Sequence, residues 1–339
     1  MEKYNIVFVE TEWSKKPLLG RRVEDFVIRE FADFDAPDCR IVKIASYKEK
    51  VALLQGYVNV VLTLDMPLVK KQNILALVRR MRAEKIRCVG LGKNNPVAKI
   101  CFDGGENEGV FSSDKAFFKI DDAKSFNVVY NLLKNRVLDD LLAHGVYILD
   151  KNTTHIDDTS NIEKGVTVLP YSRVEGESVL VNGATISASY IKDSVIDGAT
   201  VEYSYLVCSQ VQNGATIGPF ARLRGATIGK NCRIGDFVEV KASTLSDGVK
   251  AAHLTYIGDA EVGERTNVGC GSVFCNFDGV NKHKTIVGSN CFIGANTNLV
   301  APVVVGDNAY IAAGTTVTRD IEDGSFTIGR VRQDTKIKK

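Results

Sequence analysis

The sequence lacks an excess of either charge and any long hydrophobic run. Its 339 residues carry 43 lysines and arginines against 41 aspartates and glutamates, a net charge of +2. This balance argues against a general role in binding nucleic acids or membrane surfaces. No apolar stretch approaches the length of a membrane span, and Met1 opens no charged-then-apolar leader. We therefore expect a cytoplasmic protein with no nucleic-acid or membrane partner.

Closely spaced cysteine pairs are also missing. The eight cysteines form no CxxC motif and fall largely within a repeat pattern. They are predicted to be reduced thiols packed as small apolar side chains, so we expect neither a disulfide nor a metal site. The remaining composition, 45% hydrophobic and 25% charged, is that of an ordinary globular chain. Its length is sufficient for two domains with sizeable cores.

The sequence does contain an aliphatic residue at every sixth position over about half its length. The spacing holds from Ile156 to Ile186, continues in steps of five to Val211, and is regular again from Val287 to Val317. A six-residue period fits neither a helix nor a long alternating strand, and is typical of a solenoid. Each hexad is predicted to be a short strand and a tight turn, with three hexads to a triangular coil. We predict a C-terminal left-handed parallel β-helix of hexapeptide repeats over residues 146–320, followed by a tail at 321–339.

The first 125 residues alternate between strand-like and helix-like segments. The predicted strands are Asn5–Val9, Arg40–Ala45, Val58–Leu64 and Arg87–Leu91, and the predicted helices are Val23–Phe34, Lys48–Gln55 and Ile74–Arg82. This order indicates an α/β N-terminal domain, residues 1–125, with a small parallel sheet. Residues 126–145 then place five aliphatic side chains on one helical face, which predicts a linker helix.

Asp65 closes the third predicted strand, where ligands of parallel sheets usually bind. Its carboxylate is either a candidate metal ligand facing phosphates or the cap of a turn before Pro67. The first strand carries no glycine until Gly20, whereas nucleotide-binding domains place glycines there so that the backbone approaches phosphate. The sequence therefore argues against nucleotide chemistry in this domain.

The hexad spacing is interrupted twice, between Val240 and Ile257 and between Phe274 and Val287. The first interval contains His253, one of only four histidines, with Tyr256 close behind it. The second is a polar loop that brings Asn276 and Lys282. Taken alone, His253 is more often a surface histidine than a catalyst, and each lysine a solvated charge. Together they describe a base that works near neutral pH beside fixed cations, which suits an amine nucleophile on a phosphorylated substrate.

Four segments of the solenoid carry a closer resemblance: Gly218–Arg224, Asn276–Lys282, Leu299–Pro302 and Ala313–Thr318. They resemble the acetyltransferase half of the bacterial bifunctional GlmU family over roughly residues 145–332. The family acetylates glucosamine 1-phosphate with acetyl-CoA and then uridylylates the product to UDP-N-acetylglucosamine, a cell-wall precursor. The resemblance thus implies a glucosamine-1-phosphate N-acetyltransferase that uses acetyl-CoA and packs as a homotrimer.

Carried over position by position, the resemblance implies a role for each matching residue. His253 is the expected general base for the substrate amine. The substrate-binding residues are Arg224, Lys241 and Lys282 for the phosphate and Tyr256 and Asn267 for the sugar. The expected cofactor-binding residues are Cys270, through its backbone amide, and Asn276, Phe277, Ala295, Ala313 and Arg330. Phe277, Ala295 and Cys270 replace the Tyr, Ser and Ala usual in the family, a change expected to weaken coenzyme A binding.

The first domain matches the family only in fragments. Asp65-Met66-Pro67-Leu68 resembles the metal-binding segment of its uridylyltransferase domain, and Phe126-Asn127 resembles the pair that supplies a second metal ligand. The interval between Asp65 and Asn127 is short for the family, and the Gly-rich loop is missing. We expect a reduced, inactive nucleotidyltransferase-like domain, with Mg²⁺ required only if it is active. Two alternatives stay open: a bifunctional enzyme that retains uridylyl transfer, and a scaffold without catalytic activity.

Overall fold

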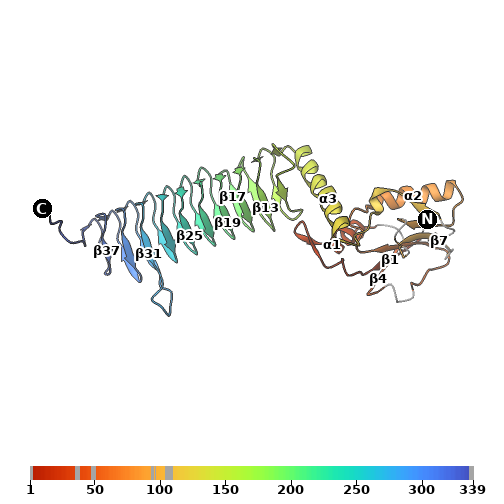
Figure 1. Ribbon diagram of the computed structural model, residues 1–339, viewed down its shortest axis with the longest axis horizontal. Coiled ribbons are helices and arrows are strands. Elements are labelled where there is room, and N and C mark those ends of the chain that lie inside the picture. Colours follow the sequence, from red (N-terminus) through yellow and green to blue (C-terminus); the bar gives the residue numbers. More distant parts are fainter. Residues whose placement is uncertain are drawn as a thin grey trace, which may run out of the picture. The chain divides into compact units, whose positions relative to one another are not determined.

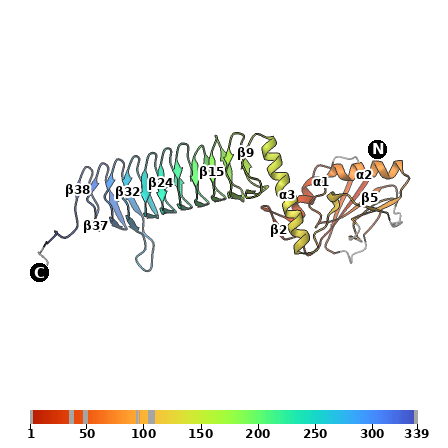
Figure 2. The ribbon, with the colours of Figure 1, turned by 45° about the horizontal axis from the view of Figure 1, so that its top comes forward.

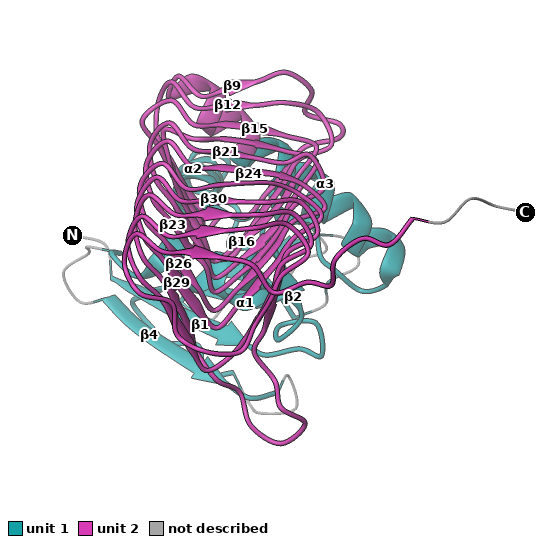
Figure 3. Cartoon of the chain, turned by 90° about the vertical axis from the view of Figure 1, so that its left-hand side faces the viewer, with its two compact units in different colours: residues 1–137 teal, residues 138–339 magenta. Residues whose placement is uncertain are grey.

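The chain forms two compact units, residues 1–137 and 138–339, coloured separately in Figure 3. The computed structural model describes residues 3–34, 39–46, 51–92, 95, 97–103 and 110–335. Helix α3 (Ala123–Ala143) runs through the boundary. Its Val129 and Leu133 belong to a core cluster of the first unit, and its Leu138 belongs to the core of the second. Among the described residues, no helix is both long and apolar enough to cross a bilayer.

The first unit is built on a six-stranded sheet in the order β4-β1-β5-β7-β6-β8. Its strands are β1 (Tyr4–Val9), β4 (Cys39–Ile44), β5 (Val58–Thr63), β6 (Cys88–Leu91), β7 (Lys99–Phe102) and β8 (Phe111–Ser112). β1 and β5 are buried along their whole length. They pair in parallel with each other, and β1 also pairs in parallel with β4, as their continuous apolar sequences predict.

The prediction of a purely parallel sheet is wrong, because the sheet is mixed. β7 lies antiparallel between β5 and β6, and the sequence analysis missed this short strand. Its insertion places Cys101 opposite Cys88, and these two cysteines form a disulfide. The prediction that all eight cysteines are reduced thiols therefore fails for this pair, since their juxtaposition depends on an antiparallel pairing that cysteine spacing does not reveal.

The elements that connect these strands follow the predicted order with one exception. They are β2 (Pro17–Leu18), β3 (Arg21–Arg22), α1 (Val23–Phe31), α2 (Lys71–Ala83) and the short 3₁₀ helix η1 (Lys115–Phe117). The predicted helix Lys48–Gln55 lies partly outside the described residues, and its described part, residues 51–55, is not helical. Five consecutive residues without a cap are too few to nucleate a helix unaided.

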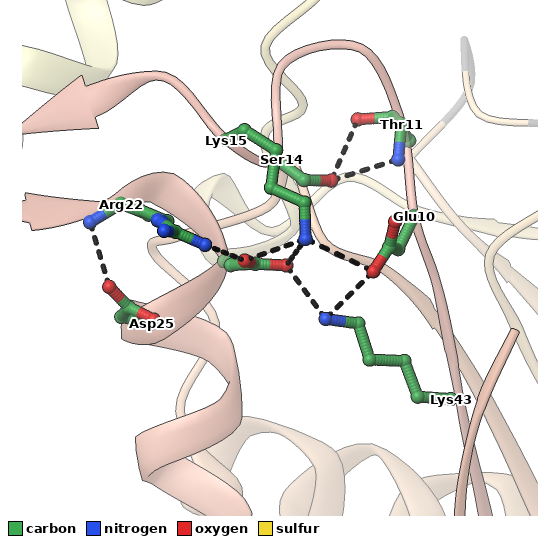
Figure 4. Close-up of polar contacts among 8 residues, drawn as sticks. Glu10, Thr11, Ser14, Lys15, Arg22, Asp25 and Lys43 are labelled. Atoms are coloured by element: carbon green, nitrogen blue, oxygen red, sulfur yellow. Dashed lines mark hydrogen bonds and ion pairs between the residues drawn. The ribbon is translucent and has the colours of Figure 1, made fainter. Parts of the chain in front are cut away.

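A buried carboxylate anchors the start of α1. Glu24 is 3% exposed, and Lys15, Lys43 and Arg22 form ion pairs with it. Figure 4 shows Lys15 and Lys43 also reaching Glu10. Burial raises the pKa of Glu24, but the hydrogen bonds from Lys43 and Lys15 outweigh it and lower the pKa overall. The pair of lysines thus keeps both carboxylates charged next to the end of β1.

The second unit is a three-sided parallel β-helix, as the hexad period predicts (Figures 1 and 2). We number its sheets as faces I, II and III. Face I comprises β10 (His155–Ile156), β13 (Arg173–Glu175), β16 (Tyr190–Lys192), β19 (Tyr205–Val207), β22 (Arg222–Arg224), β25 (Glu239–Lys241), β28 (Tyr256–Gly258), β31 (Val273–Cys275), β34 (Asn298–Val300) and β37 (Thr316–Val317).

Faces II and III complete each coil. Face II comprises β11 (Asn161–Ile162), β14 (Val179–Val181), β17 (Val195–Asp197), β20 (Gln210–Val211), β23 (Thr227–Ile228), β26 (Thr244–Leu245), β29 (Ala260–Val262), β32 (Thr285–Val287) and β35 (Val303–Val305). Face III comprises β9 (Tyr147–Ile148), β12 (Thr167–Val168), β15 (Thr185–Ser187), β18 (Thr200–Glu202), β21 (Thr216–Ile217), β24 (Arg233–Asp236), β27 (Lys250–His253), β30 (Asn267–Val268), β33 (Phe292–Ile293), β36 (Tyr310–Ile311) and β38 (Phe326–Thr327).

The aliphatic residue of each hexad points inward and forms one continuous core. Leu223, Val240 and Ile257 are fully buried and occupy matching positions on successive coils of face I. The predicted interruption between Val240 and Ile257 is not an interruption, because Leu245 and Ala251 fill the inward positions there. The alanine was too small to register as part of the aliphatic pattern. The coil is therefore regular where His253 sits.

The second predicted interruption is real. Residues 276–284 leave the coil between β31 and β32 as a loop, which projects from the stack in Figure 3. The solenoid also continues past residue 320, because β38 pairs with β36. The predicted tail at 321–339 therefore begins later, and its last residues, 336–339, lie outside the described part of the chain.

Candidate functional site

Two of the predicted phosphate-binding residues lie on neighbouring coils at one edge of face I. Arg224 ends β22 and Lys241 ends β25, and the parallel register places them directly opposite each other. Neighbouring strands are about 4.8 Å apart, so the two side chains leave the sheet side by side. Gly258 takes the same position on the next coil. The sequence thus builds a short column of cations that ends at a residue without a side chain.

Each of these cations is paired with a carboxylate. Arg224 forms an ion pair with Glu239, in which Arg224 Nε donates to Glu239 Oε1 over 3.0 Å. Lys241 Nζ lies 3.3 Å from Asp259 Oδ2. The pairs are partly exposed, and such pairs contribute little to stability, about 0–1 kcal/mol each. Their main effect is to hold the two cations in fixed positions.

Tyr256 and Asn276 close the end of this column. A side chain at Gly258 would collide with the Tyr256 hydroxyl and the Asn276 amide, so glycine leaves the space that these two groups occupy. Asn276 is 7% exposed, and its Nδ2 donates to Asp259 and lies 3.4 Å from the Tyr256 hydroxyl. The structure therefore brings together Arg224, Lys241, Tyr256 and Asn276.

The loop after Asn276 delivers Lys282 to the same place. Asp278 Oδ1 accepts from the backbone N–H groups of Val280 and Asn281 at 2.7 Å, and its Oδ2 lies 2.7 Å from His283 Nε2. These contacts lower the pKa of Asp278 to about 2, first through the Asn281 N–H. The loop is thus tied by one carboxylate that stays charged. It presents Lys282 on the exposed side.

The side-chain amines of Lys241 and Lys282 lie close to each other, and their interaction lowers the pKa of Lys282. The pKa of Lys241 is raised by this interaction and by the carboxylate of Asp259. The charge of Arg224 also lowers the pKa of Lys282. Three cations thus face two carboxylates, and an anion placed among them would relieve the repulsion.

His253 lies at the corner where face III meets face I, which is the edge of face I opposite the cations. It ends β27 on face III, where the register sets it opposite Asp236. Its Nδ1 lies 3.8 Å from Asp236 Oδ2, and its side chain is 55% exposed. A three-residue strand is about 10 Å long, and this length separates His253 from the edge with the cations. His253 and the pair Arg224 and Lys241 therefore lie at opposite ends of the short strands of face I.

The predicted coenzyme A residues form a line along the corner that begins at His253. Cys270, Ala295 and Ala313 follow β30, β33 and β36 respectively, one coil apart. Asn296 N donates to Cys270 O, and Gly314 N donates to Ala295 O, which locks the successive turns together. Arg330 Nη1 donates to Ala313 O over 2.6 Å, so the line continues to the last coil.

Two further predicted residues lie nearby, Asn267 beside this line and Phe277 in the loop after Asn276. Asn267 starts β30 on face III, in register with Lys250 and Phe292. Phe277 is 59% exposed, and its backbone forms an isolated antiparallel β-bridge with Lys282. Cys270 is exposed, and its backbone N–H has no acceptor among the described residues. An amide of this kind is available to a ligand.

Three carboxylates of the site were not predicted from the sequence, namely Asp236, Glu239 and Asp259. The sequence does contain a signal for Asp236 and Glu239, because one coil here is 17 residues long and both residues lie 17 positions from another residue of the site. Asp236 precedes His253 by 17, and Glu239 lies 17 after Arg222 and 17 before Tyr256. Charged residues repeated at the coil length are neighbours on adjacent strands.

The two candidate metal ligands of the first unit lie in different surroundings. Asp65 is 1% exposed and lines a pocket at the end of β5, whereas Asn127 is exposed on α3 and accepts from Asn131 Nδ2. Within the described residues, no group of three histidine, cysteine, aspartate or glutamate side chains is placed to hold a metal ion.

Part of the solenoid matches a family of known proteins. Residues 284–319 match the family "Bacterial transferase hexapeptide (six repeats)". Over 205 residues, the chain is 47% identical to the bifunctional protein GlmU of Clostridium beijerinckii, covering 60% of this chain and 45% of that protein. The chain is similar to the GlmU proteins over this part of its length. This confirms the resemblance found in the sequence.

A second GlmU protein extends the match. The protein from Clostridioides difficile is 39% identical over 241 residues, which cover 70% of this chain and 52% of the relative. The chain thus spans about half the length of the curated GlmU relatives it matches. A UDP-N-acetylglucosamine acyltransferase from Campylobacter jejuni also matches, with 18% identity, a TM-score of 0.33 and coverage of 52% of this chain and 71% of that one.

Proposed function

We propose that the solenoid is an acetyl-CoA-dependent N-acetyltransferase whose acceptor is glucosamine 1-phosphate and whose product is N-acetylglucosamine 1-phosphate. The observation that carries the proposal is the convergence of Arg224, Lys241 and Lys282 beside Tyr256 and Asn276. Three fixed cations with one surplus charge suit a phosphate monoester. They lie within a region related to proteins named bifunctional protein GlmU.

In this reaction His253 removes a proton from the substrate ammonium and frees the nitrogen lone pair for attack on the thioester. Asp236 faces Nδ1, which leaves Nε2 directed away from the protein for this transfer. Nitrogen attacks the thioester carbonyl directly and coenzyme A leaves as the thiol, so no cysteine nucleophile is needed. The unpaired N–H of Cys270 supports a role in polarising the carbonyl oxygen.

The strip of Cys270, Ala295, Ala313 and Arg330 is the proposed path of acetyl-CoA. Because its side chains are small, an extended pantetheine arm lies close to the backbone along this exposed corner. Arg330 supplies a cation at the far end of the strip. Asn276 and Phe277 are the proposed contacts near the acetyl group. The path starts at His253, as transfer to an amine held there requires.

We further propose that the active unit is a homotrimer. Tyr203, Phe220, Phe237 and Leu254 occupy the corner between faces III and I on successive coils, and each is more than half exposed. All four have positive φ, which costs a bulky residue roughly 1–2 kcal/mol. Corners elsewhere use asparagine at such positions, for example Asn231 and Asn290. These four side chains form an apolar ridge next to His253, and the ridge is present despite this conformational cost. It supports packing of this corner against a second copy of the chain. Such packing would bring His253 of one copy to the cations of the other.

The test is thiol release from acetyl-CoA with glucosamine 1-phosphate as acceptor. A parallel assay follows pyrophosphate release from UTP and N-acetylglucosamine 1-phosphate, with Mg²⁺ present. We expect thiol release without pyrophosphate, because the first strand is not followed by the glycines that nucleotide-binding domains place there. Pyrophosphate release would instead establish the bifunctional alternative. Failure of both assays would leave the solenoid as a scaffold.

A further inference from the structure

The first unit contains a pocket that the proposed transfer reaction does not use. It has a volume of about 750 Å³, within the range typical of small-molecule sites. It opens where β1, β4 and β5 end, which is the edge at which parallel strands usually present ligand-binding groups. Its lining includes the side chains of Glu10, Glu12, Trp13, Asp65, Lys119 and Asp121.

Asp65 is the buried polar group of this pocket. Its side chain is 1% exposed, yet Oδ1 accepts no hydrogen bond from any residue that the structure describes. The nearby Thr63 and Thr11 hydroxyls and the charge of Lys119 favour the charged form of the carboxyl group. Burial nevertheless dominates and raises the pKa of Asp65. A buried acceptor without a donor is rare in folded proteins and is normally satisfied by a ligand or an ordered water.

The rest of the lining is acidic. Glu12 and Asp121 are exposed at the pocket, while Glu10 is held by Lys15 and Lys43, as Figure 4 shows. Lys119 is the one cation that lines the pocket among the described residues. A negatively charged lining repels polyphosphates and attracts cations. It therefore disfavours a nucleoside triphosphate as the occupant.

Trp13 adds an aromatic surface to the same pocket. It packs against Phe126 with ring centroids 5.9 Å apart and remains partly exposed. Indole faces attract ammonium groups and also pack against the apolar faces of small rings. The pocket thus offers one buried carboxylate oxygen, an acidic rim and an indole ring.

We propose that this pocket binds a small organic amine of sugar size, whose ammonium group donates to Asp65 Oδ1 while its hydroxyls meet the polar rim. A compact ammonium supplies the missing donor and neutralises the buried carboxylate in a single contact. A metal ion would need several ligands that the described residues do not bring together. The site is separate from the solenoid and does not depend on the transfer reaction proposed for it.

Trp13 is the only tryptophan of the chain, so tryptophan fluorescence of the full-length protein reports on this pocket and not on the solenoid. The probes are glucosamine and glucose, which differ only in an amine or hydroxyl at one carbon. We expect a saturable fluorescence change with glucosamine and at least about tenfold weaker binding of glucose, because the charge-assisted hydrogen bond is lost. Asp65→Asn should weaken glucosamine binding by a similar factor and leave glucose binding unchanged.

Glu84→Gln is the matched control, since Glu84 is an exposed carboxylate on the same unit, paired with Arg80 away from the pocket. It should bind glucosamine like the unaltered chain. If Asp65→Asn does not fold, Glu12→Gln at the exposed rim should still weaken glucosamine binding severalfold. Equal responses to both sugars, no saturable response, or a response confined to UTP with Mg²⁺ would each overturn the proposal. Thiol-release activity is unaffected by any of these outcomes, so the two proposals fail separately.

Discussion

The two units place their polar chemistry in opposite ways. In the solenoid, the core is one uninterrupted aliphatic column, and the functional side chains stand outside it, paired with carboxylates on adjacent coils. In the α/β unit, the core is divided among several clusters, and Asp65 reaches into a pocket where one of its oxygens has no described partner.

This difference has an energetic consequence. A solenoid surface accepts substitutions of polar residues without loss of the core, because each coil contacts only its neighbours. A buried carboxylate instead reduces the stability of the unit that holds it unless a donor compensates. Function in the solenoid is therefore expected to be separable from stability, whereas in the first unit the two are coupled.

The largest expected effect is on stability. Phe274 and Phe31 are fully buried, one in each unit, and truncation of either to alanine should cost about 3–5 kcal/mol. Phe31→Ala should lower the unfolding temperature detected by Trp13 fluorescence. Phe274→Ala should lower only the transition of the solenoid, followed by the circular dichroism of its strands. If either variant shifted both transitions equally, the units would unfold as one.

The fold of the solenoid was predictable because every coil repeats the same physical solution. Inward aliphatic residues at a fixed spacing determine strand, turn and pairing at once. The predicted repeat pattern failed at Ala251, whose side chain is too small to mark the inward position. It also failed at β38, where the six-residue spacing of aliphatic residues is no longer kept. The cations of the site were found, but Glu239 and Asp259 were not, since pairing across coils is visible only once the coil length is known.

The first unit lacks such a repeat, and its prediction was correct for the α/β class, the parallel pairing of β1 with β4 and β5, and most local elements. β1, β5 and α2 follow from apolar patterns within single segments. The position of β7 between β5 and β6 depends on long-range pairing, and the Cys88–Cys101 disulfide depends on that position. Asp65 was identified from its place at the end of a strand, but the pocket around it requires side chains from distant parts of the unit.

The second prediction concerns the proposed base. His253→Ala should lower the turnover of thiol release by a factor of about 10² or more, because general-base catalysis contributes on this scale. The fold should be unchanged, since the His253 side chain is 55% exposed. His144→Ala, which removes an exposed histidine just after α3, is the control and should keep full turnover. Normal turnover in His253→Ala would remove this residue from the mechanism.

The third prediction concerns the apolar ridge of Tyr203, Phe220, Phe237 and Leu254. Phe220→Asn replaces the aromatic ring by the residue that other corners use at positive φ. The coil should be no less stable, whereas the trimer should dissociate at a concentration at least about tenfold higher, as expected for a central interface aromatic. Light scattering across a dilution series measures both species. Phe111→Asn, at an exposed aromatic of the first unit, is the control and should leave the assembly unchanged.

The smallest effect distinguishes a buried charge from a surface one. Because burial raises the pKa of Asp65 in the folded state, the folded chain holds this proton to a higher pH than the unfolded chain does. Stability therefore falls as pH rises from the unfolded pKa through the raised folded pKa, and above it the charged carboxylate is a constant penalty. Asp65→Asn should raise the stability of the first unit at neutral pH, by about 1 kcal/mol, since a neutral amide costs less to bury than a charge. The gain should vanish at acid pH, where Asp65 is itself neutral. Trp13 fluorescence during thermal unfolding at several pH values measures this difference, and a gain that persisted unchanged into acid would show that the charge of Asp65 is not its cause.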